Sequence, residues 1–429
     1  MEAVILFGSF FLLIILGLPV AFCLGLSVLF ISLIFPQIPG PLILAKSSIM
    51  GAYSFPLIAV LLFIFAGNIM NVGGLSFKII SVAQRLVGKS KSAICHVNII
   101  GCMFFAAISG SAPATVAAIG SNLLPEMTKQ GFPVRFSGAL TASAGIIGVL
   151  IPPSIPFIVY GVSSGVSIGN LFIAGIIPGL LIGFALMLYS YFIAPKLLKN
   201  VDFNETLKRL SLQKKQKYSL NESPVWSLLI PFIIMGGIYG GIFTPTEAAA
   251  VTVVYGFFVA SVLYKKVNIS DFKRVAIDSV ATSCSVLLLV VFANAFSRVI
   301  TILQIPGILG EAITAISSNP IIILLVINLI LLIVGMFMDT TAAILVLTPI
   351  FLPIVKSFGM DPVHFGVMLV TNLAIGFCTP PLGVNLFVAS KVCNLSVEEI
   401  VKANIPMLGI LIFCLALISF IPSLSLALL

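Results

Sequence analysis

The sequence predicts an all-α polytopic membrane protein built from inverted-topology repeats, with two re-entrant helical hairpins and two broken helices. Three observations predict it: the composition, two paired breaks in apolar segments, and an internal repeat without gaps. Of the 429 residues, 60% are hydrophobic and 8% are charged, and the mean hydropathy is +1.25. Soluble globular domains carry roughly 25% charged residues. A soluble enzyme is therefore disfavoured from the start.

The net charge of +9 does not indicate nucleic-acid binding, because the basic residues are scattered along loops. This pattern is typical of the excess of Lys and Arg in cytoplasmic loops of membrane proteins. The seven cysteines lie mostly in apolar segments and include no Cys-x-x-Cys pair, so neither a metal site nor a disulfide framework is predicted from them. No basic segment precedes the first apolar run, which favours an uncleaved first span.

A membrane-spanning helix needs about 20 apolar residues. Continuous spans are predicted at 3–34, 52–72, 170–194, 224–243, 246–264, 277–297 and 404–426. Shorter apolar runs occur in pairs between them, namely 92–108 with 111–128, 134–150 with 155–164, 320–337 with 341–357, and 362–378 with 383–392. Two amphipathic stretches, 75–87 and 301–315, are predicted to be either interfacial arms or ordinary connecting helices.

Basic residues set the predicted orientation. The flanks of 92–128 and the loops 196–223 and 265–274 carry most of the Lys and Arg residues. All of them can be cytoplasmic only if 92–128 enters and leaves on one side, as a re-entrant hairpin. The ends of 320–357 then lie on the opposite side. The N-terminus is therefore predicted to be cytoplasmic and the C-terminus periplasmic.

An internal repeat relates the two halves of the chain. Residues 109–180 align without a gap to 337–408, and twelve of the 72 positions are identical. Four proline pairs coincide, namely Pro125/Pro353, Pro152/Pro380, Pro153/Pro381 and Pro178/Pro406. Opposite orientation of the two windows indicates an inverted-topology repeat. We predict a first repeat in 1–223, ending in the cytoplasmic loop 196–223, and an extra span with the second repeat in 224–429.

Each half places a Pro-Pro pair inside an apolar segment. Proline has no N–H, so the pair frees carbonyl groups from the helical ladder, and unsatisfied polar groups in hydrocarbon cost several kcal/mol each. Unwound backbone of this kind coordinates Na⁺ in many transporters. We predict two Na⁺ sites, one in each repeat, formed by Ser109, Ser111, Gly148, Ile151, Pro153, Asp339, Thr340, Gly376, Thr379 and Pro381. The alternative is a plain kink, satisfied by neighbouring helices or by water.

Several motifs then carry a family resemblance. Residues 237–250 read Gly-Ile-Tyr-Gly-Gly-Ile-Phe-Thr-Pro-Thr-Glu-Ala-Ala-Ala, and the stretches 17–22, 109–115 and 151–154 agree with the same pattern. Over essentially its full length, the chain resembles the large membrane subunit (M subunit) of tripartite ATP-independent periplasmic (TRAP) transporters. Within that family it looks most like the subunits of sialic acid systems.

The resemblance implies an elevator-type secondary transporter in the inner membrane of a bacterium. In it, a transport domain, formed here by 92–164 and 320–392, slides against a scaffold. It implies a separate, small four-helix membrane subunit and a soluble periplasmic binding protein that delivers the substrate. The expected substrate is an organic acid, a carboxylate such as sialic acid or a C4-dicarboxylate, and the expected driving force is the sodium gradient.

Four residues are predicted to surround the substrate: Ser111 and Ser154 in the first repeat, with Asp339 and Asn385 in the second. Two alternatives to binding-protein-dependent import stay open. One is a stand-alone sodium/organic-anion symporter that needs no binding protein. The other is an intramembrane enzyme, which is disfavoured because no His, Lys or second acid accompanies Ser109, Ser111 and Asp339 in the repeat.

Overall fold

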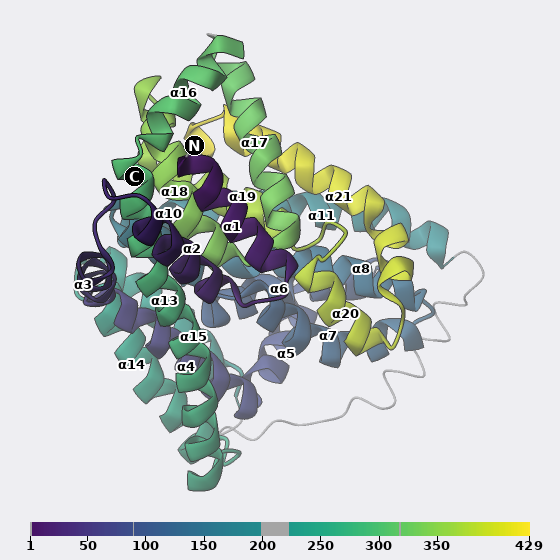
Figure 1. The fold of residues 1–429 in the computed structure, drawn as a ribbon. Coiled ribbons are helices and arrows are strands. Elements are labelled where there is room, and N and C mark those ends of the chain that lie inside the picture. The colour runs from purple at the N-terminus through teal and green to yellow at the C-terminus, as the bar shows by residue number, and fades with distance from the viewer. Residues whose placement is uncertain (1, 89, 199–222, 317–318) are drawn as a thin grey trace.

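The computed structural model describes residues 2–88, 90–198, 223–316 and 319–429. Every regular element in these ranges is a helix (Figure 1). Six of the helices are long and apolar enough to cross a membrane, and several shorter apolar helices accompany them. The predicted class, an all-α polytopic membrane protein, is confirmed.

The helices of the first half are α1 (Glu2–Ile15), α2 (Val20–Ile34), α3 (Pro41–Ala52), α4 (Leu57–Val72), α5 (Leu75–Leu86), α6 (Ala93–Ser109), α7 (Ala112–Lys129), α8 (Val134–Gly145), the 3₁₀ turn η1 (Ile146–Val149), α9 (Ile155–Ser164), α10 (Ile168–Ala174) and α11 (Ile176–Leu197). Those of the second half are α13 (Val225–Tyr239), α14 (Pro245–Phe258), the π-helical turn η3 (Val259–Leu263), α15 (Ile269–Ile302), α16 (Ile305–Ile316), α17 (Pro320–Phe337), α18 (Thr340–Ser357), α19 (Pro362–Gly376), α20 (Val384–Cys393), α21 (Val397–Phe420) and α22 (Ser423–Leu426).

One half of the molecule is organised around α15, a helix of 34 residues that packs against α2, α3 and α4. Asn268 caps its start: the side chain accepts from the Asp271 N–H, and the Asp271 carboxylate accepts from the Asn268 N–H. Glycine allows the close approach of α3, since a Cβ at Gly51 would collide with the Asn294 side chain. In Figure 1, α2 and α4 lie beside α15, and α14 packs against α4 on the same side of the molecule.

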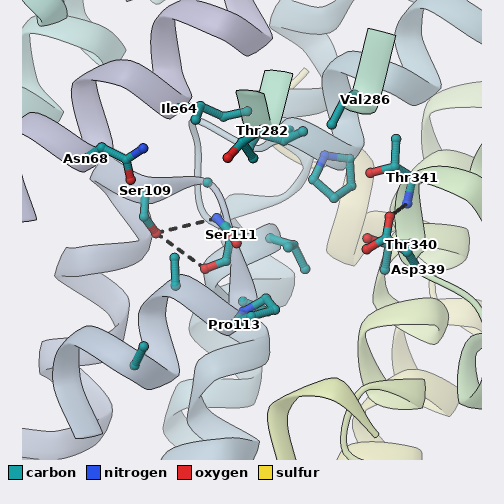
Figure 2. Close-up of a pocket in the computed structure, with 18 of the residues that line it drawn as sticks. Ile64, Asn68, Ser109, Ser111, Pro113, Thr282, Val286, Asp339, Thr340 and Thr341 are labelled. Carbon is teal, nitrogen blue, oxygen red and sulfur yellow. Dashed lines mark hydrogen bonds between the residues drawn. The ribbon is translucent and has the colours of Figure 1, made fainter. Parts of the chain in front are cut away.

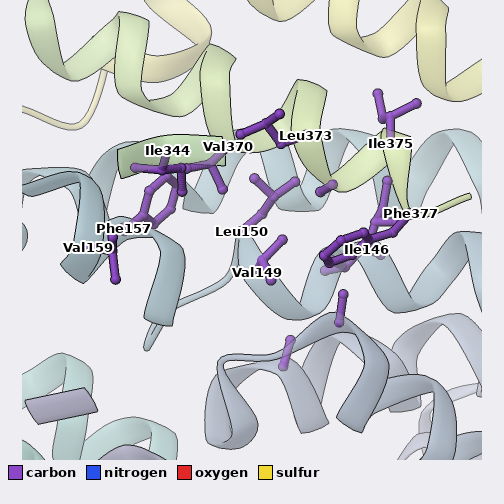
Figure 3. Packing of buried hydrophobic residues seen from close by; sticks show 14 of the residues in the cluster. Ile146, Val149, Leu150, Phe157, Val159, Ile344, Val370, Leu373, Ile375 and Phe377 are labelled. Atoms are coloured by element: carbon purple, nitrogen blue, oxygen red, sulfur yellow. The ribbon is translucent and has the colours of Figure 1, made fainter. Parts of the chain in front are cut away.

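The other half interleaves helices from both predicted repeats. Helix α9 packs against α18, while α20 packs against α7 and α8, so each repeat covers part of the other. Figure 3 shows Ile146, Val149 and Leu150 facing Leu373 and Phe377 across this junction. All five side chains are buried, so the junction is a shared apolar core, and the two predicted repeats form one packed body here.

The predicted breaks agree closely with the helix ends. Helix α6 ends at Ser109 and α7 begins at Ala112, where the sequence predicts a turn; α17 ends at Phe337 and α18 begins at Thr340. The four paired runs occur in the same order in both halves, and the peptide bonds Pro152–Pro153 and Pro380–Pro381 are both cis. The opposite orientation of the two windows, the re-entrant character of the hairpins and the domain boundaries stay predictions. Most of the loop 196–223 lies outside the described residues.

The prediction of one continuous span over 3–34 is wrong. Helix α1 ends at Ile15 and α2 begins at Val20. Gly17 adopts a φ of +82° between them, a left-handed conformation that ends a helix. Pro19 takes the N-cap position of α2, where its missing N–H costs no helical hydrogen bond. The uniform hydrophobicity of this segment hides the break.

Candidate functional site

The Pro-Pro segments and the helix-joining turns define four short regions. We name residues 146–154 break one and residues 376–383 break two. Tip one is the turn at 109–113, between α6 and α7, and tip two is the turn at 338–341, between α17 and α18. Pro152 and Pro153 offer no N–H to the carbonyls of Gly148 and Val149, the acceptors that an uninterrupted helix would pair with them.

Tip one lies directly against break one. The Ile155 N–H, just after the break, donates a hydrogen bond to the Gly110 carbonyl (3.3 Å). A Cβ built on Gly110, whose φ is +61°, would lie 2.8 Å from the Pro153 oxygen. Ser154 closes the break from within, because its hydroxyl donates to the Val149 carbonyl (2.6 Å) and accepts from the Phe157 N–H.

Three oxygens gather where tip one meets break one. The Thr115 hydroxyl donates to the Ser111 carbonyl (2.8 Å) and lies 3.1 Å from the Ser109 hydroxyl. A Cβ at Gly148 would lie 2.5 Å from the Thr115 Oγ1 and 2.7 Å from the Ser111 carbonyl oxygen. Gly148 therefore admits these oxygens to the backbone of the break. Such a set, with hydroxyl and carbonyl oxygens in an apolar region, suits a hard cation.

Break two is held differently. Its carbonyls accept hydrogen bonds from three sources: Gly376 O from the Thr379 N–H (3.0 Å), Phe377 O from the Asn385 N–H (3.1 Å), and Cys378 O from the Asn404 side-chain amide (2.9 Å). Among the residues that the structure describes, no hydrogen bond joins tip two to break two.

Gly376 packs against α17 and not against tip two. A Cβ on this residue would collide with the backbone of Gly335. Helix α17 accordingly packs mainly on α19 and touches α18 little, whereas α6 packs along α7. Only the first helix pair has the packing expected of a hairpin.

Tip two carries the charge. Asp339 is the N-cap of α18, and its Oδ1 accepts a hydrogen bond from the Thr341 N–H (2.8 Å). Short polar side chains at this position satisfy an N–H group that the helix leaves unpaired. Its aligned counterpart at tip one, Ser111, is the N-cap of α7 without a side-chain cap bond.

A cavity of about 490 Å³ separates the two tips. Figure 2 shows Ser109, Ser111 and Pro113 on one side and Asp339 with Thr341 on the other. The remaining walls come from α4, α15, the start of α9, and Phe377. The polar lining residues of the described chain are Asn68, Asn71, Ser109, Ser111, Thr282, Ser285, Asp339, Thr340 and Thr341.

The structure brings some of the predicted site residues together and leaves others apart. Ser109, Ser111, Asp339 and Thr340 line the cavity. Gly148 lies beneath tip one. The remaining predicted residues lie outside the cavity lining, namely Ile151, Pro153, Ser154, Gly376, Thr379, Pro381 and Asn385.

Two of these remaining residues have local partners of their own. The Thr379 hydroxyl donates to the Ile375 carbonyl (2.9 Å), within its own helix end. The Asn385 side-chain amide donates to the Ala142 carbonyl (3.0 Å), and its Oδ1 is buried without a partner among the described residues. Their roles in sodium or substrate binding stay predictions.

Sequence reasoning missed several polar residues at the site. Thr115 follows Ser111 by one helical turn, a spacing that could have indicated it. Asn68 and Thr282 come from α4 and α15, outside the aligned repeat windows, and Figure 2 shows both on the cavity wall above tip one. No local pattern distinguishes them from other polar residues in these helices.

The chain matches a known family model. Residues 7–424 match the model described as "Tripartite ATP-independent periplasmic transporter, DctM component". An isethionate TRAP transporter permease protein, DctMQ, from Oleidesulfovibrio alaskensis is 43% identical over 98% of this chain. This chain spans 65% of the length of that relative.

Further relatives match along most of their length. A C4-dicarboxylate TRAP transporter large permease protein from Pseudomonas aeruginosa is 40% identical over 87% of this chain and 86% of its own. A sialic acid TRAP transporter large permease protein from Vibrio cholerae is 39% identical over 96% and 95%. Among solved structures, the YdaH transporter of Alcanivorax borkumensis has a TM-score of 0.64 at 14% identity, covering 88% of this chain and 86% of that one. That likeness concerns the fold.

Proposed function

Because the chain belongs to the DctM family of tripartite ATP-independent periplasmic transporters, we propose that it imports an organic acid by sodium-coupled secondary transport. The observation that carries the proposal is the cavity of about 490 Å³ that both tips line together with α4 and α15. Family membership supports a multi-pass inner-membrane permease, that is, a transporter rather than an enzyme. Sodium coupling, the substrate and the mechanism are the proposed parts.

The first proposed sodium site lies at tip one. Ser109, Ser111 and Thr115 supply two hydroxyls and one carbonyl within hydrogen-bonding distance of one another, against the backbone of Gly148. Sodium prefers several oxygen ligands, and unwound backbone at membrane depth supplies them without a charged residue. Ile151 and Pro153, on the same unwound segment, are proposed to add carbonyl ligands.

The second proposed site lies at tip two, with Asp339 and Thr340 as the groups that line the cavity. The proposal retains Gly376, Thr379 and Pro381 as the backbone side of this site. Carbonyls that already accept one hydrogen bond keep a second lone pair for an ion. A carboxylate at membrane depth is by default a functional group, so Asp339 is the residue on which this site depends most.

The substrate is proposed to bind between the tips, in contact with Ser111 and Asp339. Asp339 is the one ionisable side chain among the described lining residues, and they include no Lys, Arg or His. An anion is therefore proposed to be stabilised by bound sodium and by helix N-termini, where unpaired N–H groups and the helix dipole favour negative charge. The relatives are named for isethionate, C4-dicarboxylates and sialic acid, all organic anions.

Transport is proposed to follow an elevator mechanism. The tips and breaks form the moving part, while α4 and α15 form the fixed wall of the cavity. The two parts come close at Gly67, since a Cβ on this residue would lie 3.5 Å from the Ser109 Cα, an ordinary contact distance. The wall residue Asn68 is held to the fixed part by a hydrogen bond to the Ser279 hydroxyl on α15 (2.9 Å).

The partners are proposed from the family as well: a small membrane subunit of the same transporter and a periplasmic binding protein. The test is uptake into proteoliposomes that contain the large and small subunits, with labelled candidate acids and the binding protein outside. We expect uptake only with an inward sodium gradient and with the binding protein present. Equal uptake with choline in place of sodium would contradict sodium coupling, and equal uptake without the binding protein would indicate a stand-alone symporter.

A further inference from the structure

Break two is tied to the first repeat by a chain of buried hydrogen bonds. The Asn404 side-chain amide, on α21, donates to the Cys378 carbonyl in the break (2.9 Å). The Ser143 hydroxyl, on α8, donates to the Asn404 Oδ1 (2.6 Å). We name Ser143, Cys378 and Asn404 the cross-repeat clasp. All three side chains are at most 2% exposed, so water does not compete for these bonds.

A second pair of bonds runs parallel to the clasp. The Cys378 thiol and the Asn385 amide both donate to the Ala142 carbonyl, at 3.2 and 3.0 Å. Cys378 thus contacts the neighbouring residues Ala142 and Ser143 through two routes, one direct and one through Asn404. In a low-dielectric interior such connected bonds strengthen one another, and an unpaired member is costly.

The clasp reaches break one along α8. Ser143 lies two residues before the end of α8 at Gly145, and η1 begins at Ile146, the first residue of break one. Gly148, which faces the oxygens of tip one, is about 9 Å further along, at rises of about 1.5 Å per residue in α8 and about 2.0 Å in the 3₁₀ turn. A movement of the Cys378 carbonyl would therefore reach the backbone of the other break through the end of α8.

We propose that Asn404 is a positioning residue that couples the two sodium sites, so that an ion bound at one break pre-orders the other. The proposal rests on the sodium sites of the proposed function and adds their cooperativity. Binding at break one fixes the end of α8, and the clasp then fixes the Cys378 carbonyl at break two. The second ion therefore meets a more ordered site and binds more tightly, which is the meaning of positive coupling between sites.

The chain supplies a matched control for the clasp. Asn98 on α6 donates its amide to the Thr141 hydroxyl on α8 (2.8 Å), and both side chains are fully buried. This pair has the chemistry and burial of the Asn404–Ser143 pair and lies two residues earlier on α8. It connects α8 to α6 and has no bond to break two, so it tests structural loosening without the proposed coupling.

The experiment measures equilibrium binding of ²²Na⁺ to the detergent-purified full chain, with choline chloride keeping ionic strength constant. For the unaltered protein we expect two ions and a Hill coefficient above 1, since it rises toward the number of sites for strong coupling. Asn404→Leu is expected to bind both ions and to lower the Hill coefficient to about 1. Its affinity for the second ion is expected to fall by the coupling factor, about 5- to 150-fold. Ser143→Ala, a milder change, is expected to give an intermediate Hill coefficient.

The outcomes separate this inference from the proposed function. Absence of sodium binding by the unaltered protein would overturn sodium coupling, and the clasp proposal with it. Two ions bound with a Hill coefficient of 1 in the unaltered protein would overturn the clasp proposal alone. The clasp proposal is also overturned if Asn404→Leu keeps the Hill coefficient of the unaltered protein, or if Asn98→Leu and Thr141→Val lower the Hill coefficient as much as Asn404→Leu does. If Asn404→Leu does not fold, Ser143→Ala against Thr141→Val decides the question.

Discussion

Break one and break two have the same backbone device and different side-chain support. Each contains a cis Pro-Pro bond at aligned positions and a glycine four residues before the first proline. Break one is closed by its own Ser154 and by tip one, which lies 45 residues earlier in the sequence. Break two is closed by Asn385 on α20 and by Asn404 on α21, which follow it in the sequence.

The two breaks thus share a backbone frame and differ in the side chains that support it. Leu382 stands where the repeat would place a counterpart of Ser154, and Ala343 stands opposite Thr115. The charge is distributed unequally as well, with Asp339 at tip two opposite the neutral Ser111. Break one has a neutral tip and is closed by that tip, whereas break two has a charged tip and is closed by α20 and α21. The two proposed sites should therefore respond differently to equivalent changes.

The largest expected difference concerns the tips. Asp339→Ala is expected to reduce sodium-driven uptake in proteoliposomes by about 10- to 150-fold, since interactions with a charged group are worth about 1.5–3 kcal/mol. Asp361→Ala is the matched control, because Asp361 caps α19 through the Val363 N–H (2.7 Å) and does not line the cavity. It should lower stability and leave the uptake rate per folded molecule unchanged. Equal loss in both variants would make Asp339 a helix cap and nothing more.

A second difference concerns Thr115, which has no hydroxyl counterpart in the second repeat. Thr115→Val keeps the shape and removes the oxygen that lies between Ser109 and Ser111. We expect about tenfold weaker sodium activation of uptake, since losing one hydrogen-bonding oxygen costs about 1–1.5 kcal/mol. Thr128→Val removes a hydroxyl with a similar bond to its own helix, further along α7, and should have no effect. A normal sodium dependence in Thr115→Val would move the first site elsewhere.

A third difference concerns Gly376, which aligns with Gly148 but packs against α17. In Gly376→Ala the new methyl group meets the Gly335 backbone, which cannot move without displacing α17. We expect a loss of about 1–3 kcal/mol in unfolding free energy, typical of overpacking, measured by the denaturation midpoint in detergent. Gly409→Ala on α21, where a Cβ meets nothing within 4 Å, is the control. If Gly376→Ala is as stable as the unaltered protein, α17 must shift to make room for the methyl group more easily than its packing indicates.

The smallest expected effect tests whether Ser154 supports the break or binds substrate. Ser154→Ala removes the bonds to Val149 O and from the Phe157 N–H. We expect a stability loss of about 0.5–2 kcal/mol, the usual range for a lost N-cap, and an unchanged ranking of substrates in competition uptake. Ser167→Ala at the exposed N-cap of α10 gives the reference for a cap alone. A changed substrate ranking in Ser154→Ala would restore Ser154 to the substrate site.

The fold was largely predictable where glycine and proline interrupt apolar segments. Pro113, Pro152 and Pro380 mark helix starts and breaks by removing N–H groups, an effect that needs no knowledge of neighbours. The break at Gly17–Pro19 was not predicted, because the segments on both sides of it are equally apolar. Together they look like one continuous membrane span. Hydrophobicity alone cannot distinguish one long span from two short helices that meet at an angle.

The candidate site was predictable only in part. Ser109, Ser111 and Asp339 stand out because polar residues at a break in an apolar segment indicate a structural or functional role. Contacts between residues far apart in the sequence leave no such mark: 261 positions separate Ser143 from Asn404. Nothing local indicates that they meet, since either side chain could as well bond to its own helix, as buried serines often do.

Asp339 is the one charged side chain among the described lining residues of the cavity, and this has an electrical consequence for the proposed mechanism. With the two proposed sodium ions and a monoanionic substrate, the loaded moving part would be neutral, whereas the empty one would carry the charge of Asp339. A membrane potential then acts on the empty return step, by up to about 2.3 kcal/mol per 100 mV for a charge that crosses the whole field. A negative cell interior drives that charge outward. The membrane potential would thus drive the return of the empty carrier after each transport cycle, while the inward step of the loaded carrier would not depend on the potential.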